Sequence, residues 1–271
     1  MKLKLFCTHL FLFALCFSSA FAQSAKQFES FNVGEKLVYE AQYSKAVFRG
    51  IAVMDLNFSV ERAPNSQDFL IKSEAKSKGT FAKLFNYKIY QNIQSTIDDK
   101  KFSVLKTVKR DEQKERRRDS TAVFNYKNRE VTYIESDPND TARAPRIVAS
   151  SIETGTQDMV TGIYALRRLP LAVGKTFELS VSDSGLVYKV PVRVTAREEI
   201  KSILGKTWCF RVEPEIFGEK RLIEQKGSMI IWITDDSRRL PVRSQINSNI
   251  GRVEVKLKSL DYNSAAPIKV K

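Results

Sequence analysis

The chain has 271 residues, of which 45 are Lys or Arg and 31 are Asp or Glu, so its formal net charge is +14. Its single histidine, His9, and two of its three cysteines, Cys7 and Cys16, fall within the first 22 residues. If that segment is a removable leader, residues 23–271 hold no imidazole and one thiol, Cys209. Ser-His-Asp and Cys-His catalytic units, histidine zinc sites and internal disulfides are then all excluded.

The first 22 residues have the layout of a secretory signal peptide. Two lysines precede an apolar run over residues 5–17, and Ala20 and Ala22 supply the small residues that precede a cleavage site. We therefore expect cleavage before Gln23, which lowers the net charge to +12 because the leader holds two lysines and no acidic residue. The protein is then exported to the periplasm or beyond the cell, with a peripheral place at the outer membrane as a further option.

Two alternatives to a cleaved signal are an uncleaved membrane anchor and lipidation of Cys16. The apolar run is shorter than the roughly 20 residues that span a bilayer, which argues against an anchor. Leu15 precedes Cys16 where a small residue is expected, which argues against lipidation. No later segment reaches about 18 uncharged apolar residues, so we expect no transmembrane helix after the leader.

Alternation of apolar and polar residues dominates the rest of the chain. In residues 52–60, for example, every second residue is apolar, and Asp55, Asn57 and Ser59 fall between them. A period of two indicates a half-buried strand. Segments of this kind are separated by turn-forming residues, and we predict strands over residues 36–43, 52–60, 69–76, 88–97, 102–109, 120–126, 130–134, 176–181, 186–197, 207–214, 227–233, 241–247 and 252–260.

Two segments have the spacing of helices instead. A short helix is expected over residues 80–85 and the main helix over residues 157–169, where apolar residues recur at i, i+4 and i+7 from Met159. Thr156 or Asp158 is suited to cap the start of the main helix, and Pro170 ends it.

The predicted fold is mainly β: a large antiparallel curved sheet or open barrel with one central α-helix packed against it. Residues 136–151 contain two prolines and little periodicity, which indicates a loop. We expect residues 23–271 to form a single β-rich domain. The alternative is two halves, residues 31–135 and 156–262, joined by that loop.

Three short motifs occur in order along the chain: Gly34-Glu35-x-Leu37-x-Tyr39, then Asp158 followed by Tyr164-x-Leu166-Arg167, then Trp232-x-Thr234-Asp235 followed by Pro241-Val242. In this order the motifs resemble an exported bacterial family known as domain-of-unknown-function family 3108. The resemblance extends over nearly all of the chain after the leader. It implies a β-rich envelope protein, and the family name itself assigns no activity.

Asp158 and Arg167 are the first candidate site residues, because they could form a charged pair that lines a cleft. The alternative is that Asp158 caps the main helix and Arg167 is a cation at its end, which ties the helix to the sheet. On the first strand, Glu35, Tyr39 and Glu40 include carboxylates suited to acid or base catalysis, but no partner for them is evident. Structural roles are therefore expected for these three.

Cys209 lies between Trp208 and Phe210 in a strand pattern, and we expect it to be buried and inert. The sequence contains no phosphate-binding loop, no dinucleotide fingerprint and no EF-hand loop. The pairs Asp98-Asp99 and Asp235-Asp236 have the character of turn residues. We therefore predict no catalytic residues, no metal site and no cofactor.

The most charged stretch, residues 109–119, holds six basic and four acidic residues. We expect a solvated hairpin tip there, with an anion-binding edge as the alternative. The excess of positive charge over the whole protein favours lipid headgroups, lipopolysaccharide phosphates or acidic glycans as partners, unless it serves solubility alone. Nucleic acid is not expected as a partner, because the protein is exported.

A curved sheet that packs on a helix encloses an apolar concavity, and such concavities bind ligands. The predicted function is therefore a non-enzymatic envelope protein that binds or carries a lipid-like or anionic envelope component. The alternative is a structural or interaction module that docks on another envelope protein through a sheet edge. The candidate ligand-binding residues are Met54, Leu56, Phe58, Asp158, Ile163, Tyr164 and Arg167.

Overall fold

The computed structural model describes residues 31–262, and the predicted signal peptide, residues 1–22, lies outside this range. The described chain forms fifteen strands and two helices. In chain order they are β1 (Glu35–Lys45), β2 (Phe48–Arg62), β3 (Phe69–Ser77), α1 (Gly79–Phe85), β4 (Ile89–Ile97), β5 (Val104–Gln113), β6 (Arg116–Asn125), β7 (Glu130–Ser136), β8 (Arg146–Ser151), β9 (Gln157–Asp158), α2 (Thr161–Arg168), β10 (Thr176–Asp183), β11 (Leu186–Ser202), β12 (Gly205–Pro214), β13 (Gly227–Thr234), β14 (Pro241–Ser248) and β15 (Gly251–Tyr262).

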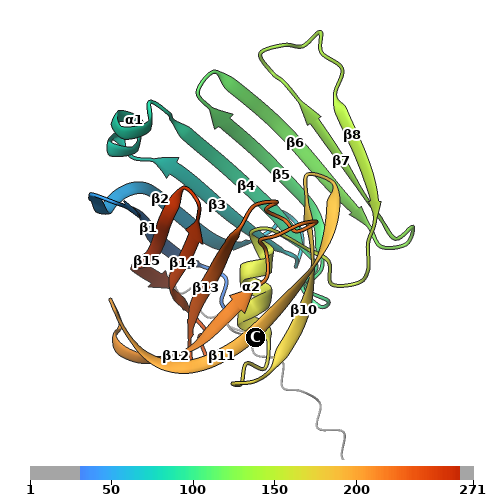
Figure 1. The fold of residues 1–271 in the computed structure, drawn as a ribbon. Helices are drawn as coiled ribbons and strands as arrows, with labels where there is room; N and C mark the ends of the chain where they lie inside the picture. The colour runs from blue at the N-terminus through green and yellow to red at the C-terminus, as the bar shows by residue number, and fades with distance from the viewer. Residues whose placement is uncertain (1–30, 263–271) are drawn as a thin grey trace, which may run out of the picture.

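All fifteen strands belong to one sheet, in the order β8-β7-β6-β5-β4-β3-β2-β1-β15-β14-β13-β12-β11-β10-β9 (Figure 1). Neighbouring strands run antiparallel, except that β9 runs parallel to β10. β1 pairs with β15, so the strands of the N-terminal half form one side of the sheet and those of the C-terminal half the other. The end strands β8 and β9 do not pair with each other, so the sheet stays open. The predicted fold class, a large curved sheet around one central helix, is confirmed.

The helix α2 lies inside the curve of the sheet (Figure 1). Tyr164 and Ala165 pack into a core cluster with Ile71 and other residues of the N-terminal strands. Leu166, on the next position, packs with Val212 and other residues of the C-terminal strands. Because α2 contributes to both clusters, it joins the two sides of the sheet from within.

The turn between β10 and β11 packs across the open side of the curve. Gly185 in this turn has φ +84°, a backbone conformation that strongly favours glycine. A Cβ atom on Gly185 would lie 2.7 Å from the Cβ atoms of Tyr133 on β7 and Val148 on β8. The missing side chain therefore allows the C-terminal half of the sheet to touch the inner face of the N-terminal half.

Both helices differ from prediction at their start, and α2 also ends one residue before the predicted end, at Arg168. The short helix α1 begins one residue before the predicted range 80–85, whereas α2 begins four residues after the predicted start of 157–169. Gln157 and Asp158 are strand residues, since they pair with β10 as β9. The side chain of Asp158 binds the backbone N–H of Thr161, so the helix begins only after this cap.

The predicted loop over residues 136–151 is wrong in its last part. Residues 146–151 form β8, which pairs antiparallel with β7. This strand lies at the edge of the sheet and none of its residues is fully buried; Ile147, for example, is 64% exposed. An edge strand without a buried face shows no apolar alternation, which is why the sequence pattern missed it.

Candidate functional site

An apolar cavity of about 470 Å³ lies between α2 and the sheet. Its volume falls in the range, roughly 300–1,000 Å³, of pockets that bind small molecules. Six of the seven candidate ligand-binding residues line this one cavity: Met54, Leu56, Phe58, Ile163, Tyr164 and Arg167. The other apolar lining residues are Leu37, Tyr39, Ala75, Ile89, Ile93, Met159, Val160, Met229, Ile231, Pro241, Ile246 and Val255.

Strand and helix periodicity explain why the six converge. Side chains alternate along a strand, so Met54, Leu56 and Phe58 share one face of β2, and this face points towards α2. On α2, Ile163 and Arg167 are one helical turn apart and therefore lie on one side of the helix. The sequence did not identify the lining residues of β4, β13 and β14, because alternation marks two faces of a strand without saying which one faces the cavity.

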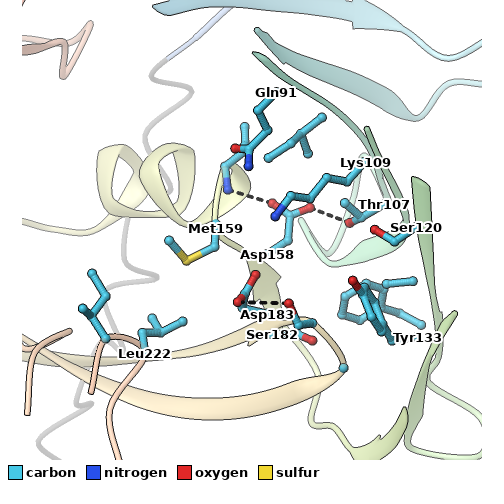
Figure 2. A pocket seen from close by; sticks show the side chains of 17 residues that line it. Gln91, Thr107, Lys109, Ser120, Tyr133, Asp158, Met159, Ser182, Asp183 and Leu222 are labelled. Atoms are coloured by element: carbon cyan, nitrogen blue, oxygen red, sulfur yellow. Dashed lines mark hydrogen bonds between the residues drawn. The ribbon is translucent and has the colours of Figure 1, made fainter. Parts of the chain in front are cut away.

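A smaller and more polar pocket of about 280 Å³, here called the polar pocket, adjoins the apolar cavity near the start of α2 (Figure 2). The two spaces share the lining residues Gln91, Ile93, Met159 and Val160, so they lie side by side. The polar side chains that line the smaller pocket are those of Gln91, Thr107, Lys109, Ser120, Tyr133, Asp158, Ser182, Asp183 and Ser184. The two adjoining spaces are therefore apolar on one side and more polar on the other.

Asp158, the seventh candidate residue, lies in the polar pocket and is held by four donors. Its Oδ1 accepts hydrogen bonds from the backbone N–H of Val160 (2.9 Å) and of Thr161 (2.8 Å). Its Oδ2 accepts hydrogen bonds from the hydroxyl groups of Ser95 and Thr107. Asp158 thus caps α2 and ties the start of this helix to β4 and β5.

Lys109 and Asp183 are the charged side chains of the polar pocket that can still form hydrogen bonds or ion pairs with a ligand. Lys109 is half-buried, and within residues 31–262 it forms no hydrogen bond or ion pair through its ammonium group. Asp183 accepts one side-chain hydrogen bond, from the hydroxyl of Ser184 (3.3 Å). Sequence reasoning missed both residues, because nothing local distinguishes an inward-facing lysine on β5 from a solvated one.

Asp158 and Arg167 do not pair with each other, because they lie at opposite ends of α2; the other interpretation, a helix cap and a helix-end cation tied to the sheet, is the one that the structure confirms. Arg167 instead donates from Nη1 to Oε1 of Glu35 (2.6 Å) and from Nη2 to Oε2 of Glu35 (2.8 Å). Nη2 also donates to the backbone carbonyl of Arg238 (3.1 Å). Glu35 and Arg167 are both fully buried, so this bidentate ion pair fastens the end of α2 to β1.

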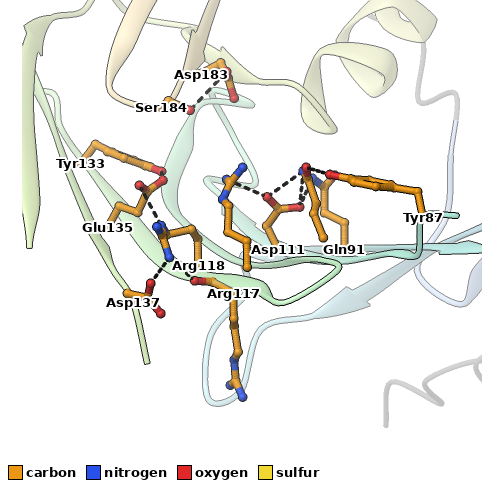
Figure 3. A network of polar contacts seen from close by, with 12 residues as sticks. Tyr87, Gln91, Asp111, Arg117, Arg118, Tyr133, Glu135, Asp137, Asp183 and Ser184 are labelled. Carbon is orange, nitrogen blue, oxygen red and sulfur yellow. Dashed lines mark hydrogen bonds and ion pairs between the residues drawn. The ribbon is translucent and has the colours of Figure 1, made fainter. Parts of the chain in front are cut away.

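Residues 109–119 form a hairpin with an exposed turn, as predicted, but strand extends through most of the segment and the tip is only two residues long. β5 and β6 include all of them except the two residues of the turn. Asp111 is buried and pairs with Arg116 on the facing strand (3.2 Å). Arg118 pairs with Asp137 in the same network (Figure 3). Cross-strand ion pairing explains why so charged a segment can enter the sheet.

Cys209 is fully buried, as predicted, and burial raises the pKa of its thiol to about 12. A thiol with so high a pKa is a poor nucleophile at neutral pH.

Within residues 31–262, no group of three or more His, Cys, Asp or Glu side chains is placed to hold a metal ion. In the same range, neither helix has the length and apolar character needed to cross a membrane.

Fold and site together define a class of protein: mainly β, with an open curved sheet that wraps a short helix and encloses an apolar cavity with a polar end. The family model of DUF3108, described as a protein of unknown function, matches residues 38–258, and the chain belongs to this family. The resemblance inferred from the three motifs is thereby confirmed. No curated protein matches the chain.

Two solved structures are similar to this chain. One is a β-barrel-like protein of domain of unknown function DUF1849 from Brucella abortus, with 9% identity and a TM-score of 0.59 over 86% of this chain and 98% of that one. The other is the hypothetical protein CT021 from Chlamydia trachomatis, with 8% identity and a TM-score of 0.35 over 87% of this chain and 90% of that one. The first likeness shows a shared fold and carries no function with it.

Proposed function

We propose that this protein is a non-enzymatic envelope protein that binds or carries a lipid-like molecule. The observation that supports the proposal is that an apolar cavity lies next to a pocket lined by charged and hydroxyl side chains. An amphiphile would place its hydrocarbon chain among the side chains of β2, β4, β13 and α2, where burial of apolar surface is favourable. Its head group would occupy the polar pocket at the start of α2. The signal-like residues 1–22 support export.

The polar pocket favours a head group that is zwitterionic or rich in hydroxyl groups. Lys109 offers a cation and Asp183 offers a carboxylate, while the charge of Asp158 is already stabilised by four donors. A purely anionic head group would meet two carboxylates and a single ammonium group. The sequence left two classes of ligand open, a lipid-like molecule and an anionic envelope component. The pocket therefore favours the lipid-like molecule.

The partners of the buried carboxylates support a binding role over catalysis. Glu35 is held by Arg167, Asp111 by Arg116, and Asp158 by four hydrogen-bond donors. A general acid or base must exchange a proton with a substrate, and a carboxylate occupied by structural partners is poorly placed to do so.

The proposal predicts that the protein retains a lipid when it is purified from its host envelope without detergent. Native mass spectrometry should then show an added mass that fragments as a lipid. Ala75 lines the cavity and Ala149 is exposed on β8, so Ala75→Phe fills the cavity and Ala149→Phe is its matched control. We expect Ala75→Phe to lower the retained lipid at least about tenfold, the effect of one misplaced apolar group in a pocket.

The control variant should retain as much lipid as the unchanged protein. If the purified protein carries no lipid and does not take up added lysophosphatidylethanolamine, the proposal fails. Equal lipid retention by the two variants would show that lipid binds elsewhere than in this cavity.

The alternative function, docking on another envelope protein through a sheet edge, has one observation in its favour. β8 is an exposed edge strand, and among the strands of residues 31–262 it pairs with β7 alone. An edge of this kind can accept a strand from another chain. The same native mass spectra test this alternative, because a second polypeptide in place of a lipid would support it.

A further inference from the structure

Three segments at one end of the sheet form a surface that is both apolar and basic, here called the rim surface. It consists of the β1–β2 turn (residues 45–50), α1 with the residues after it (79–88), and the β14–β15 turn (248–252). The aromatic rings of Tyr43 and Phe85 are 5.3 Å apart, which joins α1 to β1. The hydroxyl of Tyr43 donates to the carbonyl of Ile250 (2.6 Å), which joins β1 to the third segment.

The rim surface exposes large apolar side chains at the tips of turns. Val47 is 86% exposed, Ile250 is 60% exposed, and Phe48 and Phe85 are each more than 40% exposed. Turn tips in water usually carry polar residues, and clustered apolar side chains on a surface mark an interaction site. The exposed side chains lie on all three segments, so they are a property of the whole rim surface.

The charge of the rim surface has one sign. Its segments contain five basic residues and no Asp or Glu: Lys45, Arg49, Lys83, Lys88 and Arg252. None of the five pairs with a carboxylate within residues 31–262, and Lys45 donates instead to the carbonyl of Asn249 (3.1 Å). Basic residues elsewhere, such as Arg118, Arg197 and Arg243, have carboxylate partners. These five cations are therefore available to an anionic partner.

We infer that the rim surface docks on a lipid bilayer that contains anionic lipids. Apolar side chains interleaved with unpaired cations suit the boundary between acyl chains and phosphate groups. There, insertion of apolar side chains among acyl chains and attraction of cations to phosphate groups both lower the free energy of binding. A protein partner would need an apolar surface of matching shape and an excess of acid. A bilayer supplies the apolar layer and the negative charge in one place.

The rim surface also borders the apolar cavity. α1 connects β3 to β4, and the cavity-lining residues Ala75 and Ile89 lie on these two strands, close to either end of the helix. Phe81 of α1 and Met54, another lining residue, both pack against the small core cluster of Ala41, Tyr43 and Val53. Docking would therefore bring the cavity next to the membrane, although docking itself does not depend on a cavity ligand.

The test measures co-sedimentation of the protein, purified as its host produces it, with lipid vesicles. One set of vesicles is phosphatidylcholine alone and the other is phosphatidylcholine mixed with phosphatidylglycerol. We expect the protein to bind the mixed vesicles more tightly, and to release from them as salt is added, because salt screens the five cations. The double variant Val47→Asp with Ile250→Asp should weaken binding at least about tenfold, since it replaces two inserting apolar groups with charges that lipid phosphates repel.

The matched control changes an exposed apolar residue away from the rim surface. Ile203 is 49% exposed in the β11–β12 turn, which the pairing of β12, β13 and β14 places at the opposite end of the strands. The double variant Ile203→Asp with Val173→Asp, where Val173 is 55% exposed in the loop before β10 and outside the rim surface, introduces the same change in charge and should leave vesicle binding unchanged. Equal binding by the two double variants, or no binding to either set of vesicles, would overturn the inference.

A cavity variant separates this result from the proposed function. Ala75→Phe should lose retained lipid and still bind the mixed vesicles, because the rim surface is unchanged. Loss of vesicle binding in Ala75→Phe, with its fold intact by circular dichroism, would contradict docking through the rim surface.

Discussion

The ion pair between Glu35 and Arg167 differs from the ion pairs on the surface, because water reaches neither side chain. In contrast, Lys72 and Glu61 on the surface are 36% and 46% exposed. A buried charge that loses its partner cannot be solvated, so removal of one partner costs far more than the intact pair contributes. The pair therefore acts as a fixed joint between β1 and α2, and it holds Arg167 at the wall of the cavity.

At this scale we predict that Glu35→Gln destabilises the protein by about 3–5 kcal/mol, because the guanidinium of Arg167 stays buried opposite a neutral amide. Glu61→Gln, at the exposed pair with Lys72, should cost less than about 1 kcal/mol. Urea unfolding followed by tryptophan fluorescence measures both changes in the free energy of unfolding. Similar costs for the two variants would mean that Arg167 is solvated when Glu35 is lost.

Among the elements, α2 and the β10–β11 hairpin complete the inside of the curved sheet. α2 is held at its start by Asp158 and at its end by Arg167, so both ends are tied to strands of the N-terminal half. The hairpin touches β7 and β8 only because Gly185 has no side chain. These contacts position the polar pocket, which includes residues of both the hairpin and the N-terminal strands.

The hairpin contact can be tested by comparing two glycines of similar backbone conformation. Gly185 has φ +84° and Gly205 has φ +81°, but a Cβ on Gly205 would meet no atom within 4 Å. Both changes to Ala strain the backbone, and only Gly185→Ala also collides with Tyr133 and Val148. We expect Gly185→Ala to lower the free energy of unfolding by about 1–3 kcal/mol more than Gly205→Ala does, the usual cost of overpacking. Equal losses in urea unfolding would show that the hairpin does not press on β7 and β8.

For the whole molecule, the distribution of charge matters more than the net charge of +14. Many cations of the sheet pair with carboxylates, as Arg116, Arg118 and Arg197 do, whereas the five of the rim surface do not pair within residues 31–262. The paired carboxylates make folding depend on pH. Hydrogen bonds from Lys78 and Gln42 lower the pKa of Glu40 to about 2, from an ordinary value of 4.5.

Because the folded state binds a proton on Glu40 more weakly than the unfolded state does, this stabilisation is present above pH 4.5 and is lost as pH falls towards 2. Glu40→Gln should therefore destabilise the protein at neutral pH, and the difference from the unchanged protein should shrink as pH falls through this window. Thermal unfolding from neutral to acidic pH measures the difference. Glu219→Gln is the control, since Glu219 is exposed and unpaired within residues 31–262, and its effect should stay small at every pH. A constant difference between Glu40→Gln and the unchanged protein would refute the assignment.

Local patterns predicted much of the fold because they are properties of a few neighbouring residues. Each predicted strand segment corresponds to a strand, since alternation persists wherever one face is buried. The same alternation marked Met54, Leu56 and Phe58 as one face, and helical spacing placed Ile163 and Arg167 together. β8 was not predicted, because an exposed edge strand has no buried face and its sequence therefore shows no alternation of apolar and polar residues.

By itself, the sequence determined the class of fold, the family and six residues that line the apolar cavity, because periodicity and short motifs are local. Only the tertiary structure decided the partners of these residues. Glu35 and Arg167 are 132 positions apart in the chain, and Lys109 and Asp183 meet in one pocket only because the sheet curves. The rim surface likewise exists only because three distant turns end on the same side of the sheet. Such contacts depend on strand order and curvature, which no local pattern encodes.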